Sequence, residues 1–225
     1  MFSPSQIDFE PRLRVPFSCI IVGPSGCGKT FFVKNVLQNC IHVMDVQPQN
    51  IVWIYTSFQP MYAELQEKNK NMKFIKGLPE SFEDESLFPP DQSHLIILDD
   101  VIFQASEHPE VVRLFTQYRH HRNMSVIMLT QNVFHQGKNS RTISLNTNYM
   151  VLFKNPRDRL QMNILAQQIY PGNKSFFLQS FEDATKNPYG YLVLDMTPSC
   201  PDIYRLRSGV LRTQWLVVYV PKPKT

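Results

Sequence analysis

A glycine-rich segment at residues 23–30 constrains this chain more than any other part of its sequence. It reads Gly-Pro-Ser-Gly-Cys-Gly-Lys-Thr and fits the spacing G-x-x-x-x-G-K-[ST]. An apolar, β-rich stretch at residues 17–22 precedes it, and residues 31–40 repeat apolar side chains at helical spacing. A strand, a glycine-rich turn and a helix in this order predict a phosphate-binding loop within an α/β fold.

Each residue type in this loop has a chemical reason to be there. Glycines allow positive φ angles and let the backbone approach a phosphate closely, so that N–H groups converge on the β-phosphate of a nucleotide. Lys29 is expected to neutralise charge between the β- and γ-phosphates, and the Thr30 hydroxyl to ligate Mg²⁺. We therefore expect ATP to bind along the whole loop, which consists of Gly23, Pro24, Ser25, Gly26, Cys27, Gly28, Lys29 and Thr30.

Two weaker interpretations of the loop stay open at this point. The segment could be a glycine-rich turn with a chance lysine, although the flanking strand and helix argue against that. Cys27 could serve as a redox switch, but a cysteine that merely fills a tolerant position is the more common case.

Two consecutive aspartates follow a second apolar strand. Residues 94–100 read His-Leu-Ile-Ile-Leu-Asp-Asp, which matches the Walker B pattern of nucleotide hydrolases. Asp99 would hold the hydrated Mg²⁺ opposite Thr30, and Asp100 would orient or deprotonate the attacking water as a carboxylate base. An exposed acidic turn is the alternative, and the phosphate-binding loop earlier in the chain makes it the weaker one.

Gln131 follows a further predicted strand at residues 125–129. Carboxyl ends of parallel strands line the ligand crevice, so Gln131 could sense the γ-phosphate, or else cap the loop that follows. An arginine often stabilises the transferred phosphate. The candidates are Arg119, Arg122, Arg141, Arg157 and Arg159. Arg141 is favoured because it follows Gln131 in a polar loop that could reach a neighbouring subunit. The basic residues at 119–122 form either a contact with another subunit or with DNA, or a solvated helix end.

Strands alternate with helices over most of the chain, which predicts a mainly parallel sheet with helices on both faces. Helices are expected at residues 31–40, 61–69, 108–120, 160–170 and 174–185, and strands also at 51–55, 73–75 and 149–153. Residues 191–194, 203–206 and 215–220 predict a small β-hairpin or meander. We expect a loose arm at residues 1–14 and a single domain at 15–225, with a β-rich extension from about residue 188.

Composition sets the remaining limits. With 43% hydrophobic and 19% charged residues the chain is typical of globular proteins, and its net charge of +4 permits contact with nucleic acid without requiring it. The four cysteines lack zinc-like spacing, the start lacks a signal-peptide pattern, and the longest apolar run spans six residues, 215–220. We therefore expect an intracellular protein without a membrane partner.

Several further segments carry a resemblance to a known family. They are Val-Pro-Phe at 15–17, Leu-Ile-Ile-Leu-Asp-Asp at 95–100, His-His-Arg-Asn at 120–123, Leu-Thr-Gln-Asn-Val-Phe-His-Gln-Gly at 129–137, Arg-Thr-Ile-Ser-Leu-Asn at 141–146, and Val-Leu-Phe-Lys-Asn-Pro-Arg-Asp at 151–158. Together with the phosphate-binding loop, these segments resemble the viral genome-packaging ATPases of the FtsK–HerA superfamily. The resemblance is to the poxvirus-like branch, which includes virophages and Maverick/Polinton-type and adintovirus-like elements.

That resemblance implies an ASCE-type P-loop fold of the RecA/FtsK–HerA kind, in which residues 125–129 form a strand inserted between the strands that carry the two nucleotide motifs. It implies a homo-oligomeric ring, a pentamer or hexamer, that hydrolyses ATP at its subunit interfaces and moves double-stranded DNA of any sequence into a capsid. Gln131 would be the sensor and Arg141 an arginine finger acting in trans. The implied partners are DNA and a capsid or portal protein, at a capsid vertex in the nucleus or a cytoplasmic virus factory. Basic side chains expected to track DNA phosphates are Lys138, Arg141 and Lys154.

Three other functions fit parts of the same pattern. A small-molecule kinase of the P-loop type could use Arg157 and Arg159 as a lid, although the aspartate pair suits the activation of water better. A replication helicase would share the site of a ring ATPase, and a scaffold could bind ATP without turning it over. Stimulation of turnover by duplex or by single-stranded DNA distinguishes these alternatives.

Overall fold

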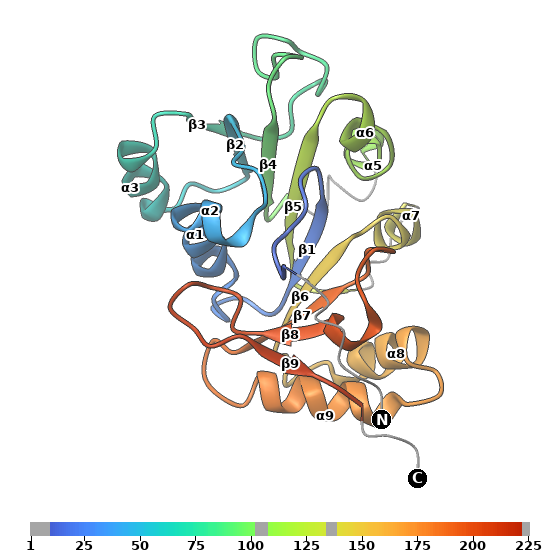
Figure 1. Ribbon diagram of the computed structural model, residues 1–225. Coiled ribbons are helices and arrows are strands. Elements are labelled where there is room, and N and C mark those ends of the chain that lie inside the picture. Colours follow the sequence, from blue (N-terminus) through green and yellow to red (C-terminus); the bar gives the residue numbers. More distant parts are fainter. Residues whose placement is uncertain (1–9, 102–107, 134–138, 222–225) are drawn as a thin grey trace.

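The strands, which alternate with helices along the chain, assemble into one sheet. The computed structural model describes residues 10–101, 108–133 and 139–221. The strand order is β3-β2-β4-β5-β1-β6-β7-β8-β9 (Figure 1). The strands are β1 (Ser18–Val22), β2 (Asn50–Tyr55), β3 (Met72–Lys76), β4 (His94–Asp99), β5 (Met124–Thr130), β6 (Tyr149–Phe153), β7 (Tyr191–Asp195), β8 (Leu206–Ser208) and β9 (Val217–Tyr219).

The predicted parallel sheet is confirmed for the strands from β3 to β6 in this order, whereas β7, β8 and β9 pair antiparallel. Strand β5 lies between β1 and β4, which confirms the expected insertion. Val22 pairs with Thr130, and Asp99 pairs with Leu129. Because these strands run parallel and in register, the segments that follow β1, β4 and β5 emerge at the same edge of the sheet.

Helices cover both faces of the sheet, as the alternation of strands and helices predicts (Figure 1). One face carries α1 (Lys29–Gln38), α2 (Cys40–Val43) and α3 (Pro60–Lys68). The other carries α5 (Pro109–Arg113), the π-helical turn η1 (Leu114–Tyr118), α7 (Ser140–Leu145), α8 (Arg159–Ile169) and α9 (Lys174–Ala184). The short helix α6 (Arg119–His121) continues η1 towards β5.

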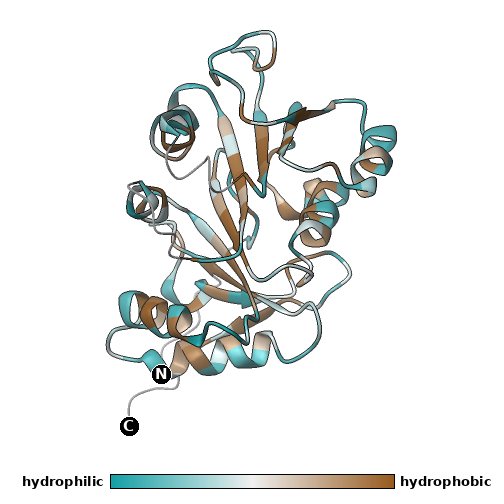
Figure 2. Ribbon diagram, turned by 180° about the vertical axis from the view of Figure 1, so that it is seen from behind, coloured by the Kyte–Doolittle hydropathy of each residue, from teal (hydrophilic) through white to brown (hydrophobic). Residues whose placement is uncertain are grey.

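Two apolar cores result from the alternation of side chains along the strands. In β1, Ile20 and Val22 pack with the helices of one face, whereas Cys19 and Ile21 pack with α1 on the other. All five residues of β1 are buried, so its apolar run forms a central strand rather than an edge. In Figure 2 the strands are mainly hydrophobic in colour, and the helices carry both hydrophobic and hydrophilic colour.

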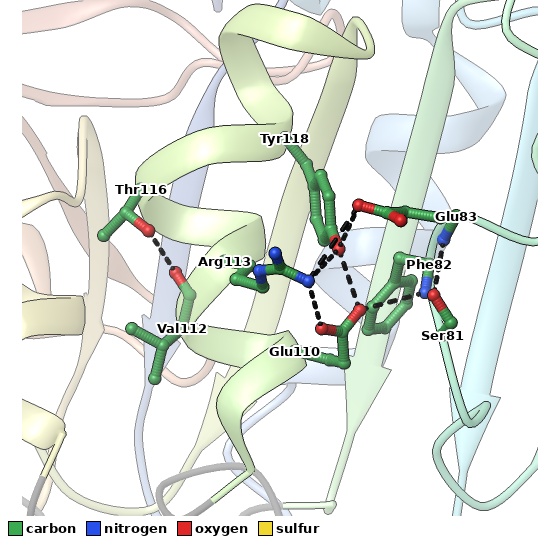
Figure 3. Close-up of polar contacts among 8 residues, drawn as sticks. All are labelled: Ser81, Phe82, Glu83, Glu110, Val112, Arg113, Thr116 and Tyr118. Atoms are coloured by element: carbon green, nitrogen blue, oxygen red, sulfur yellow. Dashed lines mark hydrogen bonds and ion pairs between the residues drawn. The ribbon is translucent and has the colours of Figure 1, made fainter.

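The predicted helix at 108–120 is confirmed, but its middle is the π-helical turn η1, and a polar cluster ties it to the loop before β4 (Figure 3). The Tyr118 hydroxyl lies 2.9 Å from Glu110 Oε2 and 3.1 Å from Glu83 Oε1. Arg113 donates to Glu110 Oε1 at 3.0 Å, and the Phe82 N–H donates to Glu110 Oε2 at 3.3 Å. The loop at residues 81–92 is thereby fixed to the helix.

The C-terminal strands confirm the predicted meander but not all of its bounds. The predicted strand at 203–206 is wrong, because a 3₁₀ turn, η2 (Asp202–Tyr204), occupies its first half and β8 begins only at Leu206. The turn is closed by the Tyr204 N–H, which donates to the Pro201 carbonyl at 2.9 Å. Beyond it, the buried guanidinium of Arg207 donates to Asp195 Oδ2 at 2.8 Å and joins β8 to β7.

Of the expected N-terminal arm, residues 1–9 lie outside the described part of the chain, and Leu13 forms a parallel bridge with Met44. No helix in the described part of the chain combines the length and apolar character that a membrane crossing requires.

Candidate active site

A pocket of about 320 Å³ opens at the edge of the sheet where β1, β4 and β5 end. It brings together the phosphate-binding loop, both aspartates and the glutamine that the sequence pointed to, although these residues are far apart along the chain. The lining residues are Ser25, Gly26, Gly28, Lys29, Thr30, Phe31, Gln59, Asp99, Asp100, Leu129, Thr130 and Gln131. The parallel register of the three strands is what places them side by side.

Backbone geometry accounts for the glycines of the loop. Gly26 and Gly28 have φ angles of +78° and +104°, which glycine adopts at little cost. At Gly23 there is no room for a side chain, because an added Cβ would lie 2.5 Å from Cys27 Sγ and 2.7 Å from Phe153 Cβ. The loop can therefore make the tight turn that close approach to a phosphate requires.

The side chain of Lys29 is held against the first residues of its own loop. Its ammonium donates to the carbonyl oxygens of Gly23 and Pro24 at 2.6 Å and 3.0 Å. The Gly23 N–H in turn donates to the Thr130 carbonyl at 3.1 Å, so the loop is anchored to β5. The positive charge of Lys29 thus lies beside the first residues of the loop, where it favours the binding of an anion.

Asp99, at the end of β4, is buried and accepts a hydrogen bond from the Tyr62 hydroxyl at 2.8 Å. Burial raises the pKa of the Asp99 carboxyl, and the neighbouring Asp100 adds to the rise, while the bond from Tyr62 and the charge of Lys29 oppose it. A buried carboxylate is costly on its own, and a cation beside it offsets that cost. Thr30 lines the same pocket, so the Thr30 hydroxyl and the Asp99 carboxylate together offer the oxygen ligands that Mg²⁺ prefers.

Asp100 differs from its neighbour in being exposed to the pocket. Its φ of +58° turns the chain sharply after β4, a conformation that aspartate tolerates better than most residues. The Asp100 carbonyl accepts a weak bond from the Thr56 hydroxyl at 3.4 Å. One carboxylate of the pair is therefore buried, and the other is exposed to solvent at the pocket.

Two residues at the start of α3 belong to the site but were not predicted from the sequence. Gln59 lines the pocket just before the helix begins, and Tyr62 holds Asp99 from within it. The Tyr62 ring is fixed in an aromatic cluster, with centroids 5.3 Å from Trp53 and 5.2 Å from Phe74. No motif marks these residues, because their role depends on how α3 packs against β2 and β3.

The structure brings none of the five candidate arginines into the pocket, and all five lie within the described residues. Arg119 donates to Asn148 Oδ1 at the opposite edge of the sheet, where β6 begins, and Arg122 lies nearby before β5. Arg141 is exposed on α7, and Arg157 and Arg159 are exposed after β6. Of the basic residues expected to track DNA, Lys154 is exposed and Lys138 lies outside the described residues.

The thiol of Cys27 does not favour the redox alternative. Burial raises its pKa, although the charge of Lys29 and backbone N–H groups partly oppose the rise. A raised pKa lowers the thiolate fraction and so the reactivity of the sulfur. The remaining described cysteines, Cys19, Cys40 and Cys200, are also free thiols.

Comparison with known protein families gives a match over most of the chain. The model of a family described as poxvirus A32 protein matches residues 5–182. No curated protein sequence matches the chain.

Solved structures with the same fold include P-loop ATPases. The DNA-packaging ATPase B204 from Sulfolobus Turreted Icosahedral Virus has a TM-score of 0.53 at 11% identity, over 93% of this chain and 100% of that one. The genome packaging NTPase B204 from Sulfolobus turreted icosahedral virus 2, in complex with ATP-gammaS, gives 0.51 at 12%, over 95% and 99%. The cytoplasmic domain of the type VII secretion ATPase EccC from Thermomonospora curvata gives 0.51 at 13%, over 90% and 25%. At these identities the likeness is one of fold.

Proposed function

The chain belongs to the poxvirus A32 protein family, and from that membership we propose that it is an ATPase that drives double-stranded viral DNA into a capsid. The observation that carries this proposal is the pocket at the edge of the sheet. It unites an anion-binding loop, a buried carboxylate and an exposed carboxylate within a P-loop fold. Such a set of groups suits the hydrolysis of a nucleoside triphosphate.

The phosphate-binding loop would hold the triphosphate of ATP. Backbone N–H groups of the loop and the Lys29 ammonium are placed to compensate the charge of the β- and γ-phosphates. Thr30 and Asp99 would hold Mg²⁺, which when bound neutralises charge on the phosphate oxygens. The buried position of Asp99 beside a hydroxyl, with its raised pKa, fits a divalent cation.

Hydrolysis would depend on the exposed carboxylate. Asp100 would accept a proton from a water molecule while the water oxygen bonds to the γ-phosphorus and the bond to ADP breaks. Gln131, exposed at the end of β5 and lining the pocket, would donate a hydrogen bond to the γ-phosphate. It would thereby link the state of the nucleotide to β5 and its following loop.

The remaining parts of the proposal concern partners. Arg141 is exposed on α7 and outside the pocket of its own chain, which supports a role as an arginine finger in the pocket of a neighbouring subunit. A closed ring of copies would place Lys154 repeatedly around a DNA channel, where it could contact phosphates regardless of sequence. A capsid or portal protein would hold the ring at a capsid vertex, in the nucleus or in a cytoplasmic virus factory.

Two variants test the site. Lys29→Ala removes the cation of the loop and is expected to abolish ATP binding, whereas Asp100→Asn should keep binding and lose hydrolysis by about 10²- to 10⁴-fold. Asparagine also adopts positive φ readily, so this variant should remain folded. ATP affinity by calorimetry, together with phosphate release, measures both properties.

The outcomes separate the two parts of the assignment. Wild-type turnover by Asp100→Asn would mean that another group activates the water. Wild-type binding by Lys29→Ala would mean that the triphosphate does not occupy this loop.

A further inference from the structure

An aromatic side chain from the far end of the chain lies against the phosphate-binding loop. A Cβ added at Gly28 would be 3.0 Å from Tyr189 Cδ1 and 3.7 Å from Tyr189 Cβ. Tyr189 is nevertheless 69% exposed, so packing against Gly28 covers only part of its ring. It therefore offers a free aromatic surface immediately beside the loop.

The backbone at this position is one that tyrosine rarely adopts. Residues 187–190 form a tight turn, closed by the Gly190 N–H, which donates to the Asn187 carbonyl at 3.0 Å. Pro188 takes the second position, and Tyr189, with a φ of +61°, takes the third, where type II turns favour glycine or asparagine. A bulky residue in this conformation is strained, and such strain is found most often at functional sites.

Core packing gives no reason for the aromatic side chain. The next residue, Gly190, is fixed by space, because an added Cβ there would lie 2.5 Å from the Ala184 carbonyl oxygen. Tyr189 has no such constraint, since most of its surface is exposed. The strain at Tyr189 is therefore not offset by burial.

The sheet order gives the direction in which a bound nucleotide would extend. Asp99 and Asp100 follow β4, on the side of β1 where β5 lies, whereas β6 and β7 lie on its other side (Figure 1). The γ-phosphate must face the two carboxylates, so the nucleoside leaves the loop towards β6 and β7. Tyr189 lies there, because it is two residues before Tyr191, the first residue of β7, which pairs with Phe153 beside Gly23.

We propose that the aromatic ring of Tyr189 is the platform on which the base of the bound nucleotide stacks. This inference rests on the proposed function, because it requires the triphosphate to occupy the loop. Stacking on an aromatic side chain tolerates any base but strengthens with the size of the base. The preferred substrate class is therefore purine nucleoside triphosphates, with no discrimination between adenine and guanine by this residue.

The test compares ATP with inorganic tripolyphosphate, which has the phosphates but no base. Tyr189→Asn is the informative variant, because asparagine adopts positive φ with less strain, so its melting temperature should not fall. This variant is expected to bind ATP roughly 5- to 100-fold more weakly, while its affinity for tripolyphosphate stays at the wild-type value. Tyr189→Phe keeps the aromatic face and should bind both ligands as the wild type does.

Two further variants show whether a loss of ATP affinity comes from the ring of Tyr189 or from the phosphate site. Trp215→Ala removes another exposed aromatic side chain, 92% exposed and outside the pocket, and should change neither affinity. Wild-type ATP affinity in Tyr189→Asn, or an equal loss for ATP and tripolyphosphate, would overturn the platform. Lys29→Ala should lose both ligands, and if it kept both, the failure would lie with the phosphate site instead.

Discussion

Asp99 is a carboxylate whose ionisation depends on its neighbours. Burial raises its pKa, and the Tyr62 hydroxyl opposes that rise by donating to Oδ2 at 2.8 Å. A hydrogen bond to the charged form stabilises that form. Tyr62 is in this sense a positioning residue, because it acts on the carboxylate rather than on the nucleotide.

Tyr62→Phe removes this hydrogen bond while keeping the ring in its aromatic cluster. Without the bond the Asp99 pKa should rise further, so the carboxylate takes up a proton at a higher pH and hydrolysis declines earlier as the pH falls. The acid limb of the pH profile of kcat/KM should therefore move to higher pH, with the rate on the alkaline side close to that of the wild type.

A matched control exists at the opposite edge of the sheet. Tyr149 is also buried, and its hydroxyl accepts a bond from the Arg14 N–H at 3.2 Å, so Tyr149→Phe should leave the acid limb in place. An acid limb that stays fixed in Tyr62→Phe, or moves to lower pH, would contradict the role assigned to Tyr62.

Among the elements, the polar cluster in Figure 3 ties the helix at residues 109–121 to the loop before β4. Glu110 accepts bonds from the Phe82 N–H and from Arg113. Burial favours a higher pKa for Glu110, but these bonds and the Tyr118 hydroxyl outweigh it, and the pKa is lowered from 4.5. The ionised glutamate therefore stabilises the fold above its unfolded-state pKa, and this stabilisation is lost as pH falls below it.

Glu110→Gln should lower the free energy of unfolding by about 1–2 kcal/mol at neutral pH, because it removes charge-assisted bonds. The difference from the wild type should shrink below about pH 4.5, where the wild-type carboxyl also becomes protonated. Urea unfolding at several pH values measures both quantities. A difference that stays constant with pH would contradict the ionised role of Glu110.

The fold could be predicted from sequence wherever one local signal decided the element. Apolar runs such as residues 17–22 and 125–129 indicate buried parallel strands, and the structure confirms them. The predicted strand at 203–206 failed because a turn closed onto Pro201 and the ion pair between Arg207 and Asp195 set its limits. The turn is a local backbone contact that no motif marks, and the ion pair depends on side chains that meet only in the folded chain.

The residues of the pocket could likewise be predicted from sequence only where a local motif or a strand end marks them. Lys29, Thr30, Asp99 and Asp100 belong to motifs whose spacing is local, and Gln131 was found from its place at a strand end. Tyr62 and Tyr189 have no motif, since Tyr62 contacts Asp99 through the packing of α3, and Tyr189 lies against Gly28 through the turn before β7. The sequence could not choose among the arginines, and the structure leaves all five outside the pocket.

For the whole molecule, the proposed role depends on coupling hydrolysis to DNA. A chain with a net charge of +4 need not bind DNA strongly alone, whereas a ring repeats the same basic positions around a channel. Contacts made with phosphates rather than with base edges should be independent of sequence and should weaken steeply with salt. A helicase would instead respond to single strands, and a small-molecule kinase to neither form.

Steady-state ATP hydrolysis without DNA, with duplex DNA and with single-stranded DNA, using Lys29→Ala as the blank, tests the central claim most directly. The expected result is turnover above the blank that duplex DNA of any sequence increases more than single strands do, with the increase fading as salt rises. Hydrolysis at the level of the Lys29→Ala blank under all three conditions, or hydrolysis that ignores duplex DNA, would contradict a DNA-translocating ATPase.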